Sequence, residues 1–515
     1  MKIISVQTMR ELDRKTIESG TPAATLMSRA GEGVYETVME LLKTLHPRFC
    51  ERLVILAGKG NNGGDAFVVA HLFAERTEFP VTVYSVAPVS GLKNEARHFA
   101  ETLPKTVQLR SCAEGVPDEA FLHGTVVIDG LLGTGISGPL KEPYADIIKK
   151  VNNSRAPVVS IDIPSGMNGD TGEVATAAVQ ADMTAVMAFP KRGMMTQNGF
   201  RYSGCMRCVD IGIPAHMSDG AEGSGEAIFE CDAASLLPAR PVDLHKGSAG
   251  HVLIVGGSRL YTGAPVLAGT AALRSGSGLV LMAVPESVRP WFWGAPAALV
   301  FQPLADNGDG FLNKDNIEEL DALKKNADSI VVGPGIGRRE GSDEVVQEIL
   351  SWPQPVIVDA DALKIIADKP HIFPDKAAHI VLTPHPGEMR ALLKAFDLTQ
   401  LLESDRHEQA VALARRVNAT VVLKGLGTVI ADSSGNTVFN TSGTNALSSA
   451  GTGDVLAGLI GGFAGQTGTC FEAAQLGTFI HGRASEVSIC SRRALIADDL
   501  LENIAEVFNE LSPNY

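Results

Sequence analysis

Short, uninterrupted runs of apolar residues alternate with helical patterns along most of the chain. In the first half these runs cover residues 53–57, 81–86, 126–129, 158–162 and 183–187, and each is bounded by glycine, proline or aspartate. A strand covered by helices on both faces of a parallel sheet is apolar at every position, so the runs predict buried parallel strands. Residues 65–75 and 94–102 predict helices between them. This alternation is typical of a doubly wound, Rossmann-like α/β domain.

The alternation restarts after a polar, glycine-rich stretch at residues 218–226. Because such a composition is typical of linkers, we expect one domain in residues 1–217, a linker in residues 218–226 and a second α/β domain in residues 227–515. The second half has its own apolar runs, at residues 252–255, 278–284, 329–332, 356–359, 380–382 and 421–423.

The composition restricts the partners and the compartment. The 515 residues carry a formal net charge of −15, which disfavours nucleic acids and anionic membranes as partners. The longest apolar run, residues 455–463, is too short to span a bilayer. Seven cysteines are few for a disulfide framework, and we interpret the isolated pair Cys205 and Cys208 as strand residues rather than a metal or redox site. We therefore expect a cytoplasmic protein without a nucleic-acid or membrane partner.

A glycine-rich loop follows the first apolar run. Gly58, Gly60 and Gly63 have the GxGxxG spacing between a predicted strand and a predicted helix. Such glycines let a dinucleotide phosphate approach the backbone at the helix N-terminus, although a purely structural turn stays an alternative. The next run ends in Ala87 and Pro88, without the acidic residue that holds a ribose in dehydrogenases, so the loop does not predict a redox domain.

Polar side chains follow three neighbouring strands of the first half. Asp129 ends one run, Asp162 and Ser165 follow another, and Asn62 lies in the glycine-rich loop. Ligands bind beyond the carboxyl ends of parallel strands, so we expect these four residues to converge there. Their oxygens suit a hard cation such as K⁺, Na⁺ or Mg²⁺. The alternative is that they only cap helices and turns.

The second half contains a glycine-rich turn that leads into an apolar helical run at residues 451–454 (GTGD). The backbone amides of such a turn form an anion hole, and Asp454 at its edge can accept a proton from a substrate hydroxyl, as in ribokinase-type kinases. No Walker motif is present, which excludes a P-loop site. Lys424 follows another strand, and His385 lies in a rigid Pro-His-Pro-Gly turn where we expect it to be exposed to ligand.

Together these motifs resemble the bifunctional NAD(P)H-hydrate repair enzymes over nearly the whole chain. The first half is similar to NAD(P)H-hydrate epimerases in its loop at 61–65 (NNGGD), LLGTG at 131–135 and DIPSG at 162–166. The second half is similar to nucleotide-dependent NAD(P)H-hydrate dehydratases, which have a ribokinase-like fold. The motifs that carry this similarity are GPGIG at 333–337, DADAL at 359–363, TPHPGE at 383–388, KGLGT at 424–428 and GTGD.

The resemblance implies a role for each motif. In the epimerase half, K⁺ would be coordinated by Asn62, Asp129 and Ser165, and the hydrated dinucleotide would be held by Asn61, Asn62, Gly63, Gly64, Asp65, Gly133, Thr134, Gly135, Ile136, Ser137, Gly138, Pro139 and Asp162. In the dehydratase half, the hydrate would contact Ala264, Gly335, His385 and Asp454, and the adenine nucleotide would contact Lys424, Gly425, Leu426, Gly427, Thr428 and Gly453.

The implied activity is repair of hydrated NADH and NADPH. The first half would interconvert the R and S hydrates with Asp162 as acid/base. Lys191 is either its weaker partner or a surface lysine. The second half would phosphorylate the hydroxyl of the S hydrate, with Asp454 as base, and eliminate phosphate. The resemblance favours ADP over ATP as the phosphoryl donor, used with Mg²⁺ and released as AMP, and it also implies a homo-oligomer. The alternative from the residues alone is a ribokinase-type small-molecule kinase with a non-catalytic N-terminal binding module.

Overall fold

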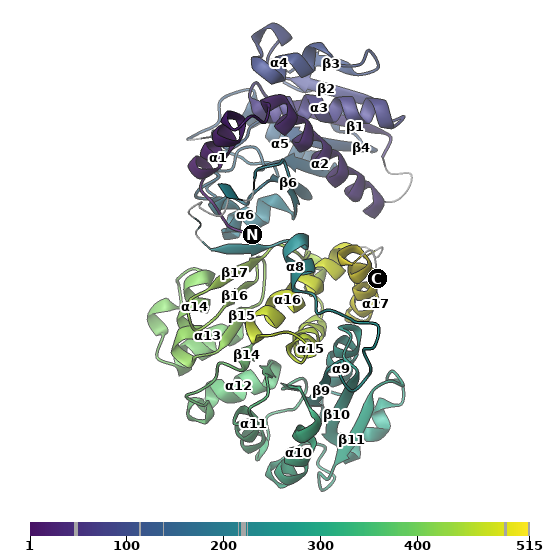
Figure 1. The fold of residues 1–515 in the computed structure, drawn as a ribbon, viewed down its shortest axis with the longest axis vertical. Helices are drawn as coiled ribbons and strands as arrows, with labels where there is room; N and C mark the ends of the chain where they lie inside the picture. The colour runs from purple at the N-terminus through teal and green to yellow at the C-terminus, as the bar shows by residue number, and fades with distance from the viewer. Residues whose placement is uncertain are drawn as a thin grey trace. The chain divides into compact units, whose positions relative to one another are not determined.

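The computed structural model describes residues 1–45, 50–112, 115–136, 138–214, 216–217, 223, 225–488 and 492–512. It divides into two compact units, Met1–Ala227 and Ile228–Tyr515 (Figure 1). Ser137 and most of the expected linker, residues 218–222 and 224, lie outside the described residues. No helix in the described part of the chain is both long and apolar enough to cross a membrane.

The first unit is built on a seven-stranded sheet in the order β3-β2-β1-β4-β5-β6-β7, and its neighbouring strands are parallel. The predicted doubly wound fold is confirmed. The strands are β1 (Arg52–Ala57), β2 (Val81–Ser85), β3 (Gln108–Ser111), β4 (Thr125–Gly130), β5 (Val158–Ile161), β6 (Met183–Met187) and β7 (Cys205–Val209). The helices are α1 (Val6–Glu18), α2 (Ala23–Thr44), α3 (Asn61–Arg76), α4 (Asn94–Glu101), α5 (Tyr144–Ser154) and α6 (Gln197–Ser203).

The apolar runs form strands because both faces of the sheet are covered. In β1, Leu53 and Ile55 pack with α1 to α4 on one face, whereas Val54 and Leu56 pack with α5 on the other. Side chains of a strand point alternately to the two faces, so each residue of the run is buried. The strand order reverses between β1 and β4, and this switch point places the loops after both strands at one crevice.

The second unit is built on a ten-stranded sheet in the order β11-β10-β9-β12-β13-β14-β15-β16-β17-β8. The neighbouring strands from β11 to β15 are parallel, whereas β16 pairs antiparallel with β15 and with β17. The strands are β8 (Glu226–Ile228), β9 (His251–Val255), β10 (Leu279–Pro285), β11 (Val300–Leu304), β12 (Ser329–Val332), β13 (Val356–Val358), β14 (Ile380–Leu382), β15 (Thr420–Leu423), β16 (Val429–Ala431) and β17 (Thr437–Asn440).

Helices cover both faces of this second sheet. One apolar layer holds α9, α15, α16 and α17, and the other holds α10 to α14. The helices are α8 (Glu230–Leu236), α9 (Gly263–Arg274), α10 (Ile317–Leu323), α11 (Ser342–Leu350), α12 (Ala360–Asp368), α13 (Pro386–Ala395), α14 (Arg406–Val417), α15 (Thr452–Ala464), α16 (Cys470–Glu486) and α17 (Ala497–Leu511). The six strands predicted in this half are present, and the motifs between them follow the carboxyl ends of the parallel strands.

Candidate functional site

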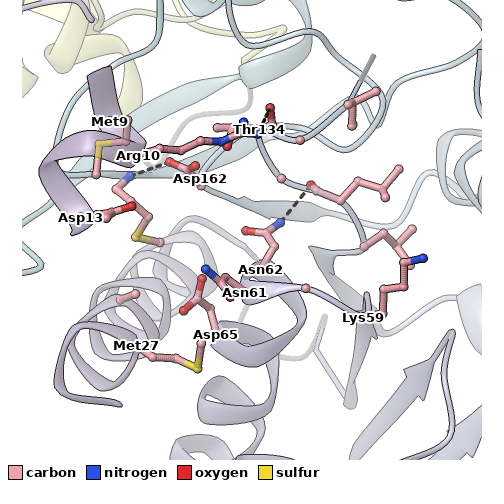
Figure 2. A pocket seen from close by; sticks show the side chains of 18 of the residues that line it. Met9, Arg10, Asp13, Met27, Lys59, Asn61, Asn62, Asp65, Thr134 and Asp162 are labelled. Atoms are coloured by element: carbon pink, nitrogen blue, oxygen red, sulfur yellow. Dashed lines mark hydrogen bonds between the residues drawn. The ribbon is translucent and has the colours of Figure 1, made fainter. Parts of the chain in front are cut away.

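A cavity of about 660 Å³ lies in the first unit, beyond the carboxyl ends of β1, β4 and β5 (Figure 2). Most of the predicted epimerase residues line it, and so do side chains of α1 and α2 that the motifs did not indicate. The lining includes Met9, Arg10, Asp13, Met27, Asn61, Asn62, Asp65, Gly133, Thr134, Gly135, Ile136, Gly138, Pro139 and Asp162. Gly63 and Gly64 lie in the first turn of α3 behind this surface.

Two glycines let the glycine-rich loop pack against the loop after β4. A Cβ atom on Gly63 would lie 1.9 Å from the carbonyl oxygen of Gly58, and one on Gly58 would lie 1.9 Å from that of Leu131. Both contacts are impossible for any other residue, so GxGxxG here serves close backbone packing. The N-cap residue of α3 is Gly60, which has no side chain to accept the first helical amides. These amides give the cavity a partial positive charge that favours an anion.

Asp162 and Lys191 form an ion pair at the cavity wall. The Lys191 side chain is fully buried, and its ammonium also donates to the carbonyl of Met187 over 3.1 Å. The surface-lysine interpretation is therefore wrong: an ammonium is buried this deeply only where a carboxylate and hydrogen bonds compensate for lost hydration. Asp162 has a φ of +63°, a left-handed conformation that is rare for a residue with a side chain and is common at functional sites.

Two further carboxyl groups of the cavity hold their protons more tightly than usual. Burial raises the pKa of Asp13 to about 6, although the charge of Lys191 acts in the opposite direction. Burial, together with the negative charges of Asp162 and Asp13, also raises the pKa of Asp65 well above its usual value. Asp13 was missed by the motifs. The available signal was its place on α1, one residue after the buried Leu12 and four after the buried Met9.

The three residues predicted to coordinate K⁺ lie together. The fully buried carboxylate of Asp129 accepts hydrogen bonds from the Ser165 hydroxyl at 2.6 Å and from the Ser165 amide at 2.9 Å. The Asn62 amide group donates to the carbonyl of Leu132 over 3.0 Å, and the Ser165 hydroxyl is 3.1 Å from the same carbonyl. Burial raises the pKa of Asp129, and within the described residues no lysine or arginine pairs with it. The oxygens of Asp129, Ser165 and Asn62 lie close together and are of the donor type that suits a hard cation.

The second site lies at the N-terminus of α15, where the GTGD turn meets β13 and β15. Lys424 donates to the carboxylate of the buried Asp359 over 2.6 Å. A Cβ atom on Gly453 would lie 3.3 Å from the Lys424 ammonium, so the ion pair lies directly under the turn. Burial lowers the pKa of Lys424, but the charges of Asp359 and Glu388 outweigh it and leave the pKa raised. Burial, with the charge of Asp359 nearby, raises the pKa of Asp454 to about 7.

His385 caps the first turn of α13. Its Nδ1 atom accepts hydrogen bonds from the amides of Gly387 at 3.0 Å and Glu388 at 3.2 Å, and the side chain is 54% exposed, as predicted. An accepting Nδ1 leaves Nε2 as the ring donor. A Cβ atom on Gly335 would lie 3.4 Å from that of Ala264, which brings these two predicted hydrate contacts together at the start of α9.

An arginine that the motifs missed holds the KGLGT loop. One guanidinium nitrogen of Arg406 donates to the carbonyl of Leu423 over 2.7 Å, and another donates to that of Leu426. Burial lowers the pKa of Arg406 to about 10. The loop also closes on itself, because the Thr428 hydroxyl donates to the carbonyl of Gly425 over 3.0 Å. These bonds hold the backbone amides of Gly425 to Thr428 in one arrangement.

Comparison with known proteins identifies the family of this chain. It is 36% identical to the bifunctional NAD(P)H-hydrate repair enzyme of Salinibacter ruber over 99% of this chain and 96% of that protein. It is 34% identical to the bifunctional NAD(P)H-hydrate repair enzyme of Moorella thermoacetica over 99% of this chain and 97% of that protein. The chain belongs to the bifunctional NAD(P)H-hydrate repair enzymes.

Each half of this repair enzyme also matches a family model. Residues 23–193 match the YjeF-related protein N-terminus, and residues 252–506 match the NAD(P)H-hydrate dehydratase model. A crystal structure of the ADP/ATP-dependent NAD(P)H-hydrate dehydratase of Bacillus subtilis, co-crystallised with ATP and Mg²⁺, is 29% identical with a TM-score of 0.48. It covers 56% of this chain and 99% of that one. The resemblance predicted from the motifs, with its two-domain α/β fold and its enzymatic function, is confirmed.

Proposed function

We propose that the first unit interconverts the R and S forms of hydrated NADH and NADPH, and that the second unit dehydrates the S form at the expense of an adenine nucleotide. The observation that carries this proposal is the separation of two built sites, one in each unit, at the carboxyl ends of parallel strands. We assign the epimerase to residues 1–217 and the dehydratase to residues 227–515, with residues 218–226 as the linker. We also propose a cytoplasmic homo-oligomer that binds no nucleic acid or membrane.

In the epimerase site, the pyrophosphate binds at the N-terminus of α3, and the loop of residues 133–139 covers the dinucleotide. The uncapped amides of α3 support the first assignment. Asp162 is the acid/base at the reacting ring, because it lines the cavity and its carboxylate is positioned by an ion pair with the buried ammonium of Lys191. Asn62, Asp129 and Ser165 hold K⁺, which supplies positive charge next to the buried Asp129 carboxylate.

In the dehydratase site, Ala264, Gly335 and His385 bind the hydrate, and the residues from Lys424 to Thr428 bind the nucleotide with Gly453. Hydroxide is a poor leaving group, whereas phosphate is a good one. Asp454 therefore accepts the proton of the hydrate hydroxyl as that oxygen attacks the terminal phosphorus, and the amides of the GTGD turn bind the transferred phosphoryl oxygens. A carboxyl pKa of about 7 matches this role, since the group is half ionised near neutral pH.

The lone pair of the ring nitrogen then expels the phosphate. Loss of a proton from the ring carbon next to the one that carried the phosphate restores the dihydronicotinamide. We propose ADP as the donor, which leaves as AMP. Mg²⁺ would neutralise the phosphate charge, and the carboxylates of Asp361 and Glu388, at the carboxyl ends of β13 and β14, are oxygen donors of the type it prefers. His385, with Nε2 as its donor, would hydrogen-bond the hydrate.

The test supplies the full chain with an R and S mixture of hydrated NADH and with ADP, ATP or neither, and follows dihydronicotinamide absorbance. Nucleotide-dependent recovery of the whole mixture supports both activities and identifies the donor. If only the S form is recovered, and the R form disappears no faster than by spontaneous epimer exchange, the proposed epimerase activity is wrong. A stable phosphorylated product without restored NADH would support a small-molecule kinase in its place.

A further inference from the structure

Three carboxyl groups line the epimerase cavity, and the buried ammonium group of Lys191 pairs with one of them; each of the four comes from a different segment. Asp13 lies on α1, Asp65 on α3, Asp162 directly after β5, and Lys191 after β6. Figure 2 shows the side chains of Asp13, Asp65 and Asp162 directed into the same space. A reacting group in that space is therefore within reach of more than one acid or base.

The carboxyl groups of Asp13 and Asp162 have different environments. Asp162 forms an ion pair with the ammonium of Lys191 and accepts a hydrogen bond from the Met187 amide over 3.1 Å. Among the described residues, the Asp13 carboxyl has no hydrogen bond or ion pair. Burial raises its pKa to about 6, with Lys191 lowering it and Asp162 raising it further. A carboxylate that is ion-paired with a buried lysine, and a second carboxyl group in the same cavity without such a contact, have the environments of a base and an acid.

We infer that Asp13 is a second catalytic residue of the epimerase and exchanges a proton with the ring nitrogen of the hydrate, while Asp162 exchanges a proton with its hydroxyl. This inference rests on the proposed epimerase function of the first unit and deepens it. Asp13 precedes residues 23–193, the part of the chain that matches the family model, so that match assigns it no role.

Ring opening of the hydrate moves two protons, one from the hydroxyl oxygen and one to the ring nitrogen. Water adds to an enamine at the carbon bonded to nitrogen, so the hydroxyl-bearing carbon of the hydrate is a hemiaminal. Asp162 takes the hydroxyl proton, and the O–H electron pair forms a carbonyl group. The bond from this carbon to the ring nitrogen breaks, its electron pair stays on nitrogen, and the nitrogen takes the proton of Asp13.

The open chain rotates about the adjacent carbon–carbon bond before it closes. The nitrogen lone pair then attacks the other face of the carbonyl carbon, Asp13 recovers the proton from nitrogen, and the new alkoxide oxygen takes back the proton held by Asp162. Both residues return to their starting states, no atom is lost, and no oxidant or reductant is needed.

The experiment measures R-to-S exchange in the full chain, without nucleotide, in Asp13→Asn and in Glu11→Gln, an exposed carboxylate of the same helix. After subtraction of the spontaneous exchange, we expect Asp13→Asn to lower kcat about 100-fold or more with KM changed less than about twofold. Glu11→Gln should match the wild type, and Asp13→Glu should recover part of the rate. Nucleotide-dependent dehydration of the S form by the second unit should be unchanged in all three variants. The unchanged KM for epimer exchange shows that the first unit of Asp13→Asn is folded.

The pH profile separates catalysis from a structural role. Exchange by the wild type should slow as pH rises above about 6, because Asp13 loses its proton, and this decline should be absent in Asp13→Asn. The charged groups that set this profile are Lys191, Asp162 and Asp65. Wild-type kcat in Asp13→Asn, or a raised KM with kcat unchanged, would overturn the inference alone. An absence of exchange in the wild type itself would overturn the proposed function.

Discussion

Replacement of Asp454 by asparagine should inactivate the dehydratase and stabilise the unit that contains it. The side chain keeps its size but can no longer accept a proton, so we expect kcat for dehydration to fall about 100- to 10,000-fold. Nucleotide binding should persist, because the amides of the GTGD turn and the KGLGT loop remain in place.

The stability gain follows from the pKa of the Asp454 carboxyl, which rises from 3.8 to about 7 on folding. A carboxyl group whose pKa is raised by folding destabilises the folded state when it is ionised. The resulting loss in the free energy of unfolding grows as pH rises from 3.8 to 7 and is constant above 7. The shift of about three pKa units corresponds to about 4 kcal/mol at pH 8, and to about 2 kcal/mol at pH 5, where the folded state keeps the proton. Asparagine removes this penalty.

Tryptophan fluorescence measures this unit selectively, because the three tryptophans of the chain, Trp291, Trp293 and Trp352, all lie in it. We would compare urea unfolding of the wild type, Asp454→Asn and Asp309→Asn, an exposed aspartate of the same unit, at pH 8 and pH 5. The gain should appear only in Asp454→Asn and should be larger at pH 8. An equal gain at both pH values, or none, would refute the electrostatic argument, and retained dehydration would remove Asp454 as the base.

Three other changes test the two sites. Lys191→Met should abolish epimer exchange and lower the free energy of unfolding of the first unit by about 3–5 kcal/mol, because Asp162 loses its ion pair with Lys191; unchanged resistance to limited proteolysis would contradict this. Arg406→Lys keeps the charge but cannot bridge two carbonyls of the nucleotide loop, so the nucleotide KM should rise about tenfold, against an unchanged KM for the hydrate. Gly335→Ala places a Cβ atom 2.7 Å from the carbonyl oxygen of Tyr261 at a φ of +66°, so the hydrate KM should rise while the nucleotide KM does not; equal effects on both would show general misfolding.

The sheets could be predicted from the sequence because buried parallel strands are apolar at every position. The exceptions in the first unit are β3, whose four residues are all exposed at the edge of the sheet, and β7, whose apolar residues are interrupted by Arg207. The site residues predicted correctly as neighbours, such as Asn62, Asp129 and Ser165, follow strands whose ends meet at one edge. That rule depends only on strand order and polarity, which the alternation of apolar and helical segments already indicates.

Residues that meet by tertiary packing could not be predicted in this way. Asp13 precedes the first strand, so the strand-end rule says nothing about where α1 lies. Lys191 was as consistent with a surface position as with a buried one, since its burial depends on Asp162, which is 29 residues away. Likewise, Lys424 pairs with Asp359 across 65 residues of sequence, and the motifs did not predict this ion pair under the GTGD turn.

The complete burial of the Lys191 side chain makes it a natural reporter of local opening. Acylating reagents attack only a neutral amine that solvent can reach, so Lys191 should stay unmodified while exposed lysines of the same unit react. Labelling of Lys191 requires local opening of the first unit around this side chain, and the rate of labelling measures how often this opening happens. Bound dinucleotide should slow that reaction by stabilising the closed form. Mass spectrometry of a single tryptic site could thus follow occupancy of the epimerase without any turnover.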